Sequence, residues 1–358
     1  MNEQRKICFF NTATFWGGGE KWHFEASEQL SKTTHKAFFV CDGEGELAKR
    51  LENLNIEKHH VSANSLSFLN PSKINKLTQF FKTHKIDTII FNNSRDLKLG
   101  GRAAKKAGVT TIVYRRGIAV EVKKSRLNEY FFSNIVTHFI FNSHATKALL
   151  QKNYQAVIAT KKTAIIYNAI EFPQKILLPS STSNPQIIIG NAGRLVAQKA
   201  QHFLIDIARK LKQENLNFKI LIAGDGELYQ DLKQKISHQN LTNHIELLGF
   251  VEDMSLFMNQ IDVFVSTALW EGFGFVLAEA MVAKKPVLAF DVSSNPELIE
   301  EGKNGHLIPL KDIDCFASKI AKLIKDEALR KKMGVAAYNF AKTNFEKEQQ
   351  FQKLLDFI

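Results

Sequence analysis

The sequence is poor in cysteine and has no long apolar run, and each shortage excludes a class of protein. Its 358 residues include three cysteines, Cys8, Cys41 and Cys315, which form neither a CxxC pair nor a zinc-ligand spacing. We therefore expect reduced thiols in a cytoplasmic protein and no metal site. No stretch reaches the roughly 18 apolar residues of a transmembrane helix. The apolar run 7–10 is too short for a secretory signal.

Acidic residues are scarce in the first half of the chain. Residues 1–180 hold 27 Lys and Arg against 14 Asp and Glu, whereas residues 181–358 hold 21 against 22. The net charge of +12 therefore comes from the first half, where it favours an anionic partner such as nucleic acid, an acidic bilayer or a phosphorylated glycolipid. A lysine-rich surface that only solubilises the protein is the alternative. The aromatic-basic pattern of RNA-binding modules is absent, so we expect no nucleic-acid partner.

Short apolar segments alternate with longer helical ones, which is typical of parallel sheets covered by helices on both faces. Strands are expected at 7–10, 37–40, 88–91, 110–114, 138–141, 163–167, 187–190, 219–223, 245–248, 263–266, 286–290 and 305–308. Helices are expected between most of them, for example at 20–31, 72–83, 200–214 and 227–238. The fold class is therefore α/β, with two Rossmann-like parallel-sheet domains facing a cleft.

The alternation pauses once, in a stretch rich in proline and serine. We expect a first domain at 1–172, a linker at 173–186 and a second domain at 187–334. Residues 335–358 are expected to be helical. They either cap the second domain or cross back to the first.

The segment from Trp270 to Met281 follows the expected strand 263–266 and leads into a run of good helix formers. The amides around Gly274, Phe275 and Val276 would lie at a helix N-terminus, which favours a phosphate. Glu279 lies about one turn further on, where its carboxylate can accept hydrogen bonds from a ribose diol. Glu271 precedes the helix and can reach a sugar held near the amides. The alternative is an ordinary turn and a core helix.

Basic residues also follow the expected strand 187–190. Arg194 and Lys199 lie near its carboxyl end, where open α/β sheets bind ligands, and can neutralise a diphosphate. Two solvated charges in a loop are the alternative. After the first strand, Gly17, Gly18 and Gly19 allow a ligand to approach the backbone closely. This loop is not GxGxxG, which disfavours a dinucleotide-binding dehydrogenase.

In combination these segments resemble glycosyltransferase family 4, whose members have the GT-B fold. Arg194 and Lys199 match the diphosphate-binding pair of the family, and Glu271 and Glu279 match its E-x7-E motif. The loop that contains Gly249 and Phe250 also stands in the family order, and the resemblance implies that it binds the donor. In the first half, Gly17-Gly18-Gly19-Glu20 resembles the glycine loop of the family, and Tyr167-Asn168-Ala169 resembles its Tyr-Asn-Gly segment.

The first half departs from the family at the centre of sugar transfer. Many members carry a histidine after a first-domain strand, whereas here Arg115-Arg116-Gly117 follows the expected strand 110–114. Arg116 is the candidate there, either to stabilise the leaving diphosphate or to bind an anionic acceptor. Asp96, at the end of Asn92-Asn93-Ser94-Arg95-Asp96, can act as a base toward an acceptor hydroxyl. It could equally cap the following helix or pair with Arg95.

The resemblance implies a retaining glycosyltransferase that uses a nucleotide-diphosphate sugar as co-substrate and no cofactor. Glu271, Arg116 and Asp96 form the candidate catalytic set. We expect an acceptor glycan or glycolipid, such as a lipopolysaccharide core. The basic first half suggests a peripheral enzyme on an anionic inner-membrane surface. A nucleotide-sugar epimerase or phosphorylase on the same fold is one alternative, and a non-catalytic protein that binds anionic ligands is another.

Overall fold

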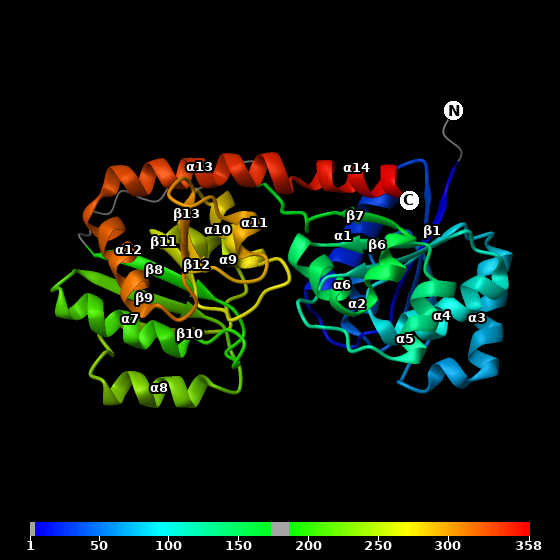
Figure 1. Cartoon of the computed structure of the whole chain (residues 1–358), viewed down its shortest axis with the longest axis horizontal. Coiled ribbons are helices and arrows are strands. Elements are labelled where there is room, and N and C mark those ends of the chain that lie inside the picture. Colours follow the sequence, from blue (N-terminus) through cyan, green and yellow to red (C-terminus); the bar gives the residue numbers. More distant parts are fainter. Residues whose placement is uncertain (1–3, 173–185) are drawn as a thin grey trace. The chain divides into compact units, whose positions relative to one another are not determined.

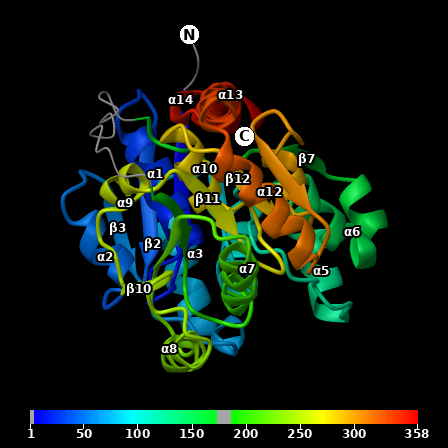
Figure 2. The ribbon, with the colours of Figure 1, turned by 90° about the vertical axis from the view of Figure 1, so that its left-hand side faces the viewer.

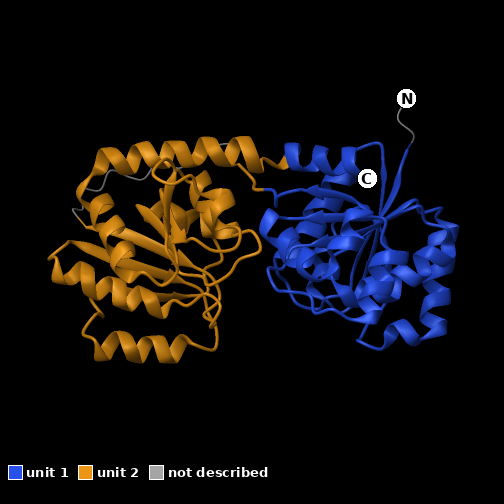
Figure 3. Ribbon diagram, viewed as in Figure 1, with its two compact units in different colours: residues 1–169, 348–358 blue, residues 170–347 orange. Residues whose placement is uncertain are grey.

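A computed structural model describes residues 4–172 and 186–358 and divides the chain into two compact units. Unit 1 comprises Met1–Ala169 and Glu348–Ile358, and unit 2 comprises Ile170–Lys347 (Figure 3). The end of the chain thus returns to unit 1. The expected linker 173–186 lies, apart from Gln186, outside the described residues.

The sheet of unit 1 has seven strands, all paired in parallel, in the order β3-β2-β1-β4-β5-β6-β7. Its inner strands are apolar and buried on both faces, as in β4. The bounds are β1 Lys6–Asn11, β2 Lys36–Cys41, β3 Glu57–His60, β4 Thr88–Phe91, β5 Thr111–Arg116, β6 His138–Phe141 and β7 Lys162–Ile165. The sequence did not predict β3, because this edge strand is polar.

Helices cover both faces of this sheet (Figure 1). One face carries α1 Gly18–Ser31, α2 Glu46–Leu51 and α14 Lys347–Phe357, with Leu354 of α14 buried in its core. The other face carries α3 Pro71–Thr83, α4 Ser94–Ala107, α5 Arg126–Asn134 and α6 His144–Ala159, with the short 3₁₀ helix η1 Ser67–Leu69 beside α4. Side-chain N-caps start α3 to α6, at Asn70, Asn93, Ser125 and Ser143.

The sheet of unit 2 has six parallel strands in the order β10-β9-β8-β11-β12-β13. The bounds are β8 Ile187–Ala192, β9 Phe218–Ala223, β10 Ile245–Gly249, β11 Val263–Ser266, β12 Val287–Phe290 and β13 Gly305–Ile308. In both units the strand order reverses at a central pair, β1 and β4 or β8 and β11. Such a switch point is where doubly wound sheets bind ligands, outside the carboxyl ends of the strands.

The helices of unit 2 also form two layers, which Figure 2 shows above and below its strands. They are α7 His202–Gln213, α8 Tyr229–His238, α9 Met254–Gln260, α10 Phe275–Val282, α11 Asn295–Leu298, α12 Ile313–Lys325 and α13 Glu327–Phe345. The long α13 packs tightly, because a Cβ on Gly334 would lie 2.0 Å from the Lys284 carbonyl oxygen. The predicted fold class, with two parallel-sheet α/β domains, is confirmed. No helix of the described residues could cross a bilayer.

His23 in α1 makes the stability of unit 1 depend on pH. Its ring is fully buried against Phe9, Trp22 and Phe39, and neither ring nitrogen has a hydrogen-bond partner. Burial, helped by nearby Arg115, holds its pKa well below the ordinary value. The neutral ring is therefore strongly favoured in the folded state, whereas the unfolded chain takes up a proton near pH 6.5.

We therefore expect His23 to lower the free energy of unfolding by about 1 kcal/mol when the pH falls from about 7 to 5.5. The stabilisation that His23 contributes is fully present above the pKa of its ring in the unfolded chain. It is lost as the pH falls below that value. Urea unfolding at both pH values measures how much unfolding free energy each protein, wild type and His23→Leu, loses between them. The loss should be larger in wild type. Equal losses in the two proteins would contradict the prediction.

Candidate active site

The switch point of unit 2 brings together the loops that follow β8 and β11. Hydrogen bonds that involve their backbones join them: Leu269 N donates to Gln198 O at 2.9 Å, Gln198 Nε2 to Trp270 O at 2.8 Å, and Thr267 Oγ1 to Lys199 O at 3.0 Å. One backbone bond and two side-chain-to-backbone bonds therefore hold the two loops against each other. The side chains of these loops at the sheet edge therefore have fixed attachment points.

Lys199 and Glu271 form an ion pair across these two loops. Their side chains are only 20% and 13% exposed, so water screens the charges weakly. Gly193 makes room for the lysine stem, because a Cβ there would lie 3.3 Å from Lys199 Cε. The hydroxyl of Ser294 donates to the Glu271 carbonyl oxygen at 3.2 Å and steadies the other partner. Two residues predicted from separate motifs are thus in direct contact.

Glycines bring the loops after β9 and β10 against the β8 loop. A Cβ on Gly224 would lie 2.0 Å from the Gly193 carbonyl oxygen, and its φ of +139° also favours glycine. The Gly224 amide donates to Gly249 O at 2.7 Å, and the Leu195 amide donates to Asp225 O at 2.9 Å. This frame leaves Arg194 exposed and the Phe250 ring 79% exposed at the same edge.

The α10 helix begins at Phe275, a short turn after Glu271. Gly274 is its N-cap residue in the left-handed region, with φ +86°, and no side chain caps the helix. The amides of Phe275 and Val276 lie in its first turn, where the helix dipole favours an anion. Glu279 is half-buried one turn further along. Cations, helix amides and carboxylates at one sheet edge can together hold a diphosphate with hydroxyl groups on either side.

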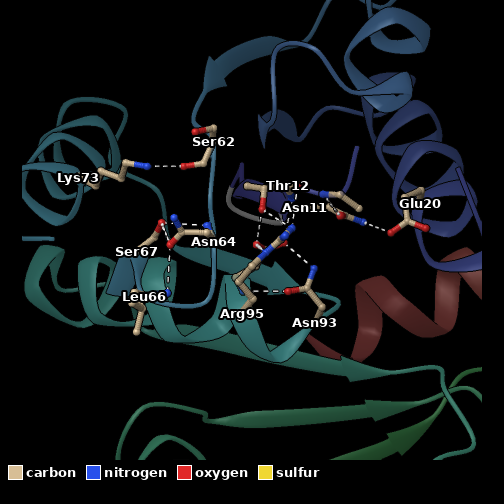
Figure 4. Close-up of polar contacts among 12 residues, drawn as sticks. Asn11, Thr12, Glu20, Ser62, Asn64, Leu66, Ser67, Lys73, Asn93 and Arg95 are labelled. Atoms are coloured by element: carbon tan, nitrogen blue, oxygen red, sulfur yellow. Dashed lines mark hydrogen bonds and ion pairs between the residues drawn. The ribbon is translucent and has the colours of Figure 1, made fainter. Parts of the chain in front are cut away.

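At the switch point of unit 1, Asp96 is fully buried and surrounded by donors. The Thr12 amide donates to it at 2.8 Å, Asn93 Nδ2 at 2.6 Å and Arg95 Nε at 3.4 Å. Burial raises the pKa of this carboxyl against the opposing effect of these bonds. Figure 4 shows Thr12, Asn93 and Arg95 converging between the end of β1 and the start of α4. The geometry favours the alternative in which Asp96 fastens these elements and pairs with Arg95, while Asn93 caps the helix.

Sequence reasoning missed a buried arginine beside this cluster. Arg115 at the end of β5 is 1% exposed and donates to Asn92 Oδ1 at 2.8 Å and to Asn168 Oδ1, and its guanidinium lies 4.3 Å from the Trp22 ring centroid. Burial lowers its pKa to about 9. Asn92 also explains why Gly19 of the glycine loop is a glycine, because a Cβ there would lie 1.9 Å from Asn92 Nδ2. The feature of the sequence that could have indicated this buried arginine is its position directly after the apolar residues of an expected strand.

The predicted site residues therefore fall into two groups, one in each unit. Unit 2 holds Arg194, Lys199, Gly249, Phe250, Glu271, Gly274, Phe275, Val276 and Glu279 around its switch point. Unit 1 holds Gly18, Gly19, Asp96 and Arg116. Gly18 and Gly19 begin α1, whereas Arg116 is half-buried at the end of β5 and donates to the Val120 carbonyl oxygen.

Two parallel-sheet units of this strand order are the architecture of GT-B glycosyltransferases, and comparison with known families agrees. Residues 16–172 match the model of Glycosyltransferase Family 4, and residues 175–340 match that of Glycosyl transferases group 1. The chain belongs to this glycosyltransferase family, as the motifs predicted.

Curated relatives include an Escherichia coli UDP-Gal:alpha-D-GlcNAc-diphosphoundecaprenol alpha-1,3-galactosyltransferase. It is 25% identical over 90% of this chain and 89% of its own length. A Staphylococcus aureus poly(ribitol-phosphate) alpha-N-acetylglucosaminyltransferase is 30% identical over 47% of this chain, but the match spans only 34% of that relative. A Methanocaldococcus jannaschii uncharacterized glycosyltransferase is 32% identical over 63% of this chain and 61% of its own length.

Solved structures share the fold over nearly the whole chain. Anabaena HepE in complex with UDP and glucose has a TM-score of 0.80 and 24% identity, over 99% of each chain. The lipopolysaccharide outer core galactosyltransferase WaaB has a TM-score of 0.79 and 20% identity, over 98% of each chain. At these identities the likeness concerns the fold alone.

Proposed function

We propose that this glycosyltransferase moves a sugar from a nucleoside-diphosphate donor to a cell-surface glycan, with retention of anomeric configuration. The observation that carries the proposal is the Lys199–Glu271 pair at the switch point of unit 2, next to the start of α10. The pair places a diphosphate-binding cation and a sugar-binding carboxylate in contact. The complex of HepE with UDP and glucose lends support, because a protein of the same fold binds such ligands.

In this proposal the donor lies along the carboxyl edge of the unit 2 sheet. Arg194, Lys199 and the amides of residues 274–276 hold the diphosphate, Glu279 accepts hydrogen bonds from the ribose, and Glu271 orients the sugar. Gly249 and Phe250 complete the donor site. Negative charge grows on the diphosphate as the glycosidic bond breaks, so fixed positive groups stabilise the transition state more than the ground state. This mechanism uses no cofactor and no metal.

Unit 1 receives the acceptor in this proposal. The names of two relatives describe alpha-linked products, which supports retention from an alpha-linked donor. The E. coli relative acts on a sugar carried by diphosphoundecaprenol. Together with the basic first half, this supports a phosphorylated glycolipid, such as a lipopolysaccharide core, on the cytoplasmic face of an inner membrane. Gly18 and Gly19 are proposed to contribute to donor binding, and Arg116 either stabilises the leaving diphosphate or binds an anionic acceptor.

Product analysis tests the proposal. The enzyme is incubated with UDP-galactose, UDP-glucose or UDP-N-acetylglucosamine and a diphosphate-linked glycolipid acceptor. The product is then examined by NMR, and we expect an extended glycolipid with an alpha linkage. A beta linkage would contradict retention. An altered nucleotide sugar without transfer would indicate an epimerase, and a sugar phosphate would indicate a phosphorylase.

The two glutamates are expected to have separable effects. Glu279→Gln should weaken the binding of the free nucleoside diphosphate about tenfold, since a hydrogen bond to a charged group contributes about 1.5–3 kcal/mol and the neutral bond that glutamine keeps contributes about 0.5–1.5 kcal/mol. Glu271→Gln should mainly lower kcat, because its proposed partner is the sugar. Calorimetric titration with UDP and steady-state kinetics distinguish these effects. Unchanged UDP affinity in Glu279→Gln would show that the ribose lies elsewhere.

A further inference from the structure

The segment from Gly117 to Tyr130 of unit 1, between β5 and the middle of α5, exposes large apolar side chains. Ile118 is 54% exposed, Val120 50%, Leu127 38% and Tyr130 49%. Leu127 and Tyr130 are three residues apart on α5 and therefore share one face of that helix. Four exposed apolar side chains so close in sequence form a docking segment rather than the scattered exposure of an ordinary surface.

The backbone of this docking segment is fixed by partners on α6. Asn153 Nδ2 donates to the Val122 carbonyl oxygen at 3.1 Å. The Tyr154 hydroxyl donates to Lys123 O at 2.8 Å and accepts from the Ser125 amide at 3.0 Å. Tyr154 itself is 2% exposed and sits at a break in the helical dihedrals of α6. The segment is therefore held in one conformation with its apolar side chains in water.

The same segment carries cations that are not neutralised. Lys123, Lys124 and Arg126 are exposed and form no ion pair with any residue of 4–172 or 186–358. Glu121 is engaged by Lys152 at 3.7 Å, and its Oε1 accepts from Asn153. The other acidic residue of the segment, Glu129, is half-buried, so the charges facing solvent between the apolar side chains are mainly positive.

We propose that the docking segment enters the surface of an anionic bilayer, with Ile118 and Val120 among the lipid headgroups and Lys123, Lys124 and Arg126 on the lipid phosphates. This inference rests on the proposed function, in which the acceptor is a glycolipid. Apolar side chains next to unpaired cations match the surface of an anionic bilayer, where negative headgroups lie over apolar acyl chains. Tyrosine is suited to the same boundary, because its ring is apolar and its hydroxyl is polar. A nucleic acid would leave the apolar side chains uncovered.

Vesicle co-sedimentation of the full chain tests the proposal, with phosphatidylglycerol-containing vesicles against pure phosphatidylcholine. Wild type should bind the anionic vesicles and release them as salt rises. The triple variant Lys123→Ser, Lys124→Ser, Arg126→Ser should lose roughly 100-fold in partitioning, since each basic residue near such a surface contributes about fivefold. The double variant Ile118→Ser, Val120→Ser should lose about tenfold or more, because its apolar surface no longer leaves water.

Two matched control variants remove three positive charges, or two exposed apolar side chains, outside the docking segment. Lys76→Ser, Lys82→Ser, Lys85→Asn lowers the charge of the same unit by the same amount. Leu310→Ser, Val335→Ser removes side chains of unit 2 that are 49% and 50% exposed. Both controls should bind vesicles like wild type. Losses equal to those of the docking-segment variants would overturn the inference.

Other outcomes separate this inference from the proposed function. Equal binding to neutral and anionic vesicles, or binding to RNA alone, would overturn the docking surface. If sugar transfer to a soluble acceptor persisted in that case, the proposed function would stand. Vesicle binding as described, without transfer from any nucleotide sugar, would support docking and contradict the proposed function. UDP-induced thermal stabilisation should be the same in every docking-segment variant and in wild type.

Discussion

Lys199→Ala is expected to lower kcat/KM for the nucleotide-sugar donor roughly 10- to 150-fold, because a charge-assisted contact contributes about 1.5–3 kcal/mol. The ammonium group lies in a weakly screened site against Glu271, so its removal also leaves that carboxylate without its ion-pair partner. Donor-dependent kinetics measure the loss. Thermal unfolding checks that the fold is intact.

The matched control is Lys219→Ala in the same unit. Lys219 pairs with Glu246, but the two side chains are 31% and 48% exposed, so the pair contributes little. Its removal should leave the kinetics unchanged. Arg194→Ala should resemble Lys199→Ala, because both are assigned to the diphosphate. Wild-type donor kinetics in both variants would show that the diphosphate binds elsewhere.

Arg115→Met is expected to lower the free energy of unfolding of unit 1 by about 3 kcal/mol. The change leaves the buried oxygens of Asn92 and Asn168 without this donor, at about 1–3 kcal/mol each. It also removes a cation–π contact with Trp22, while the cost of burying the charge is recovered in part. The unfolding temperature should fall by roughly 6–12 °C for a unit of this size.

Arg116→Met is the control for this prediction, since it changes the adjacent arginine, which is half-buried and donates to a backbone carbonyl. Its unfolding temperature should change little. Circular dichroism melts of the two variants and wild type give the comparison. If Arg115→Met were as stable as wild type, the prediction would be wrong. The free energy of desolvating the guanidinium would then equal the stabilisation from its hydrogen bonds and its contact with Trp22.

Apolar runs were enough to predict the sheets, because parallel strands buried on both faces leave a strong pattern. The exception is β3, whose residues Glu57 to His60 are polar because the strand lies at an edge. Switch-point topology follows from alternation and right-handed crossovers, so the positions of Lys199 and Glu271 at the carboxyl edge could be predicted as well.

The contacts themselves could not be predicted. Lys199 and Glu271 are 72 positions apart, and only the folded loops bring them together. Arginine usually lies at the surface, so the burial of Arg115 depends on Trp22 of α1 and on Asn92 and Asn168 from two separate loops. For Asp96 the sequence left a base and a structural residue equally open, and burial with several donors favours the second.

Hydrogen–deuterium exchange with and without UDP tests most directly whether the donor diphosphate binds at the switch point of unit 2. We expect slower exchange in peptides covering 193–199 and 270–279, since ligand contacts and reduced local opening protect amides there. The same peptides in Lys199→Ala should show less protection at equal UDP concentration. Protection confined to residues 12–20 of unit 1, with the unit 2 peptides unchanged, would contradict the central assignment.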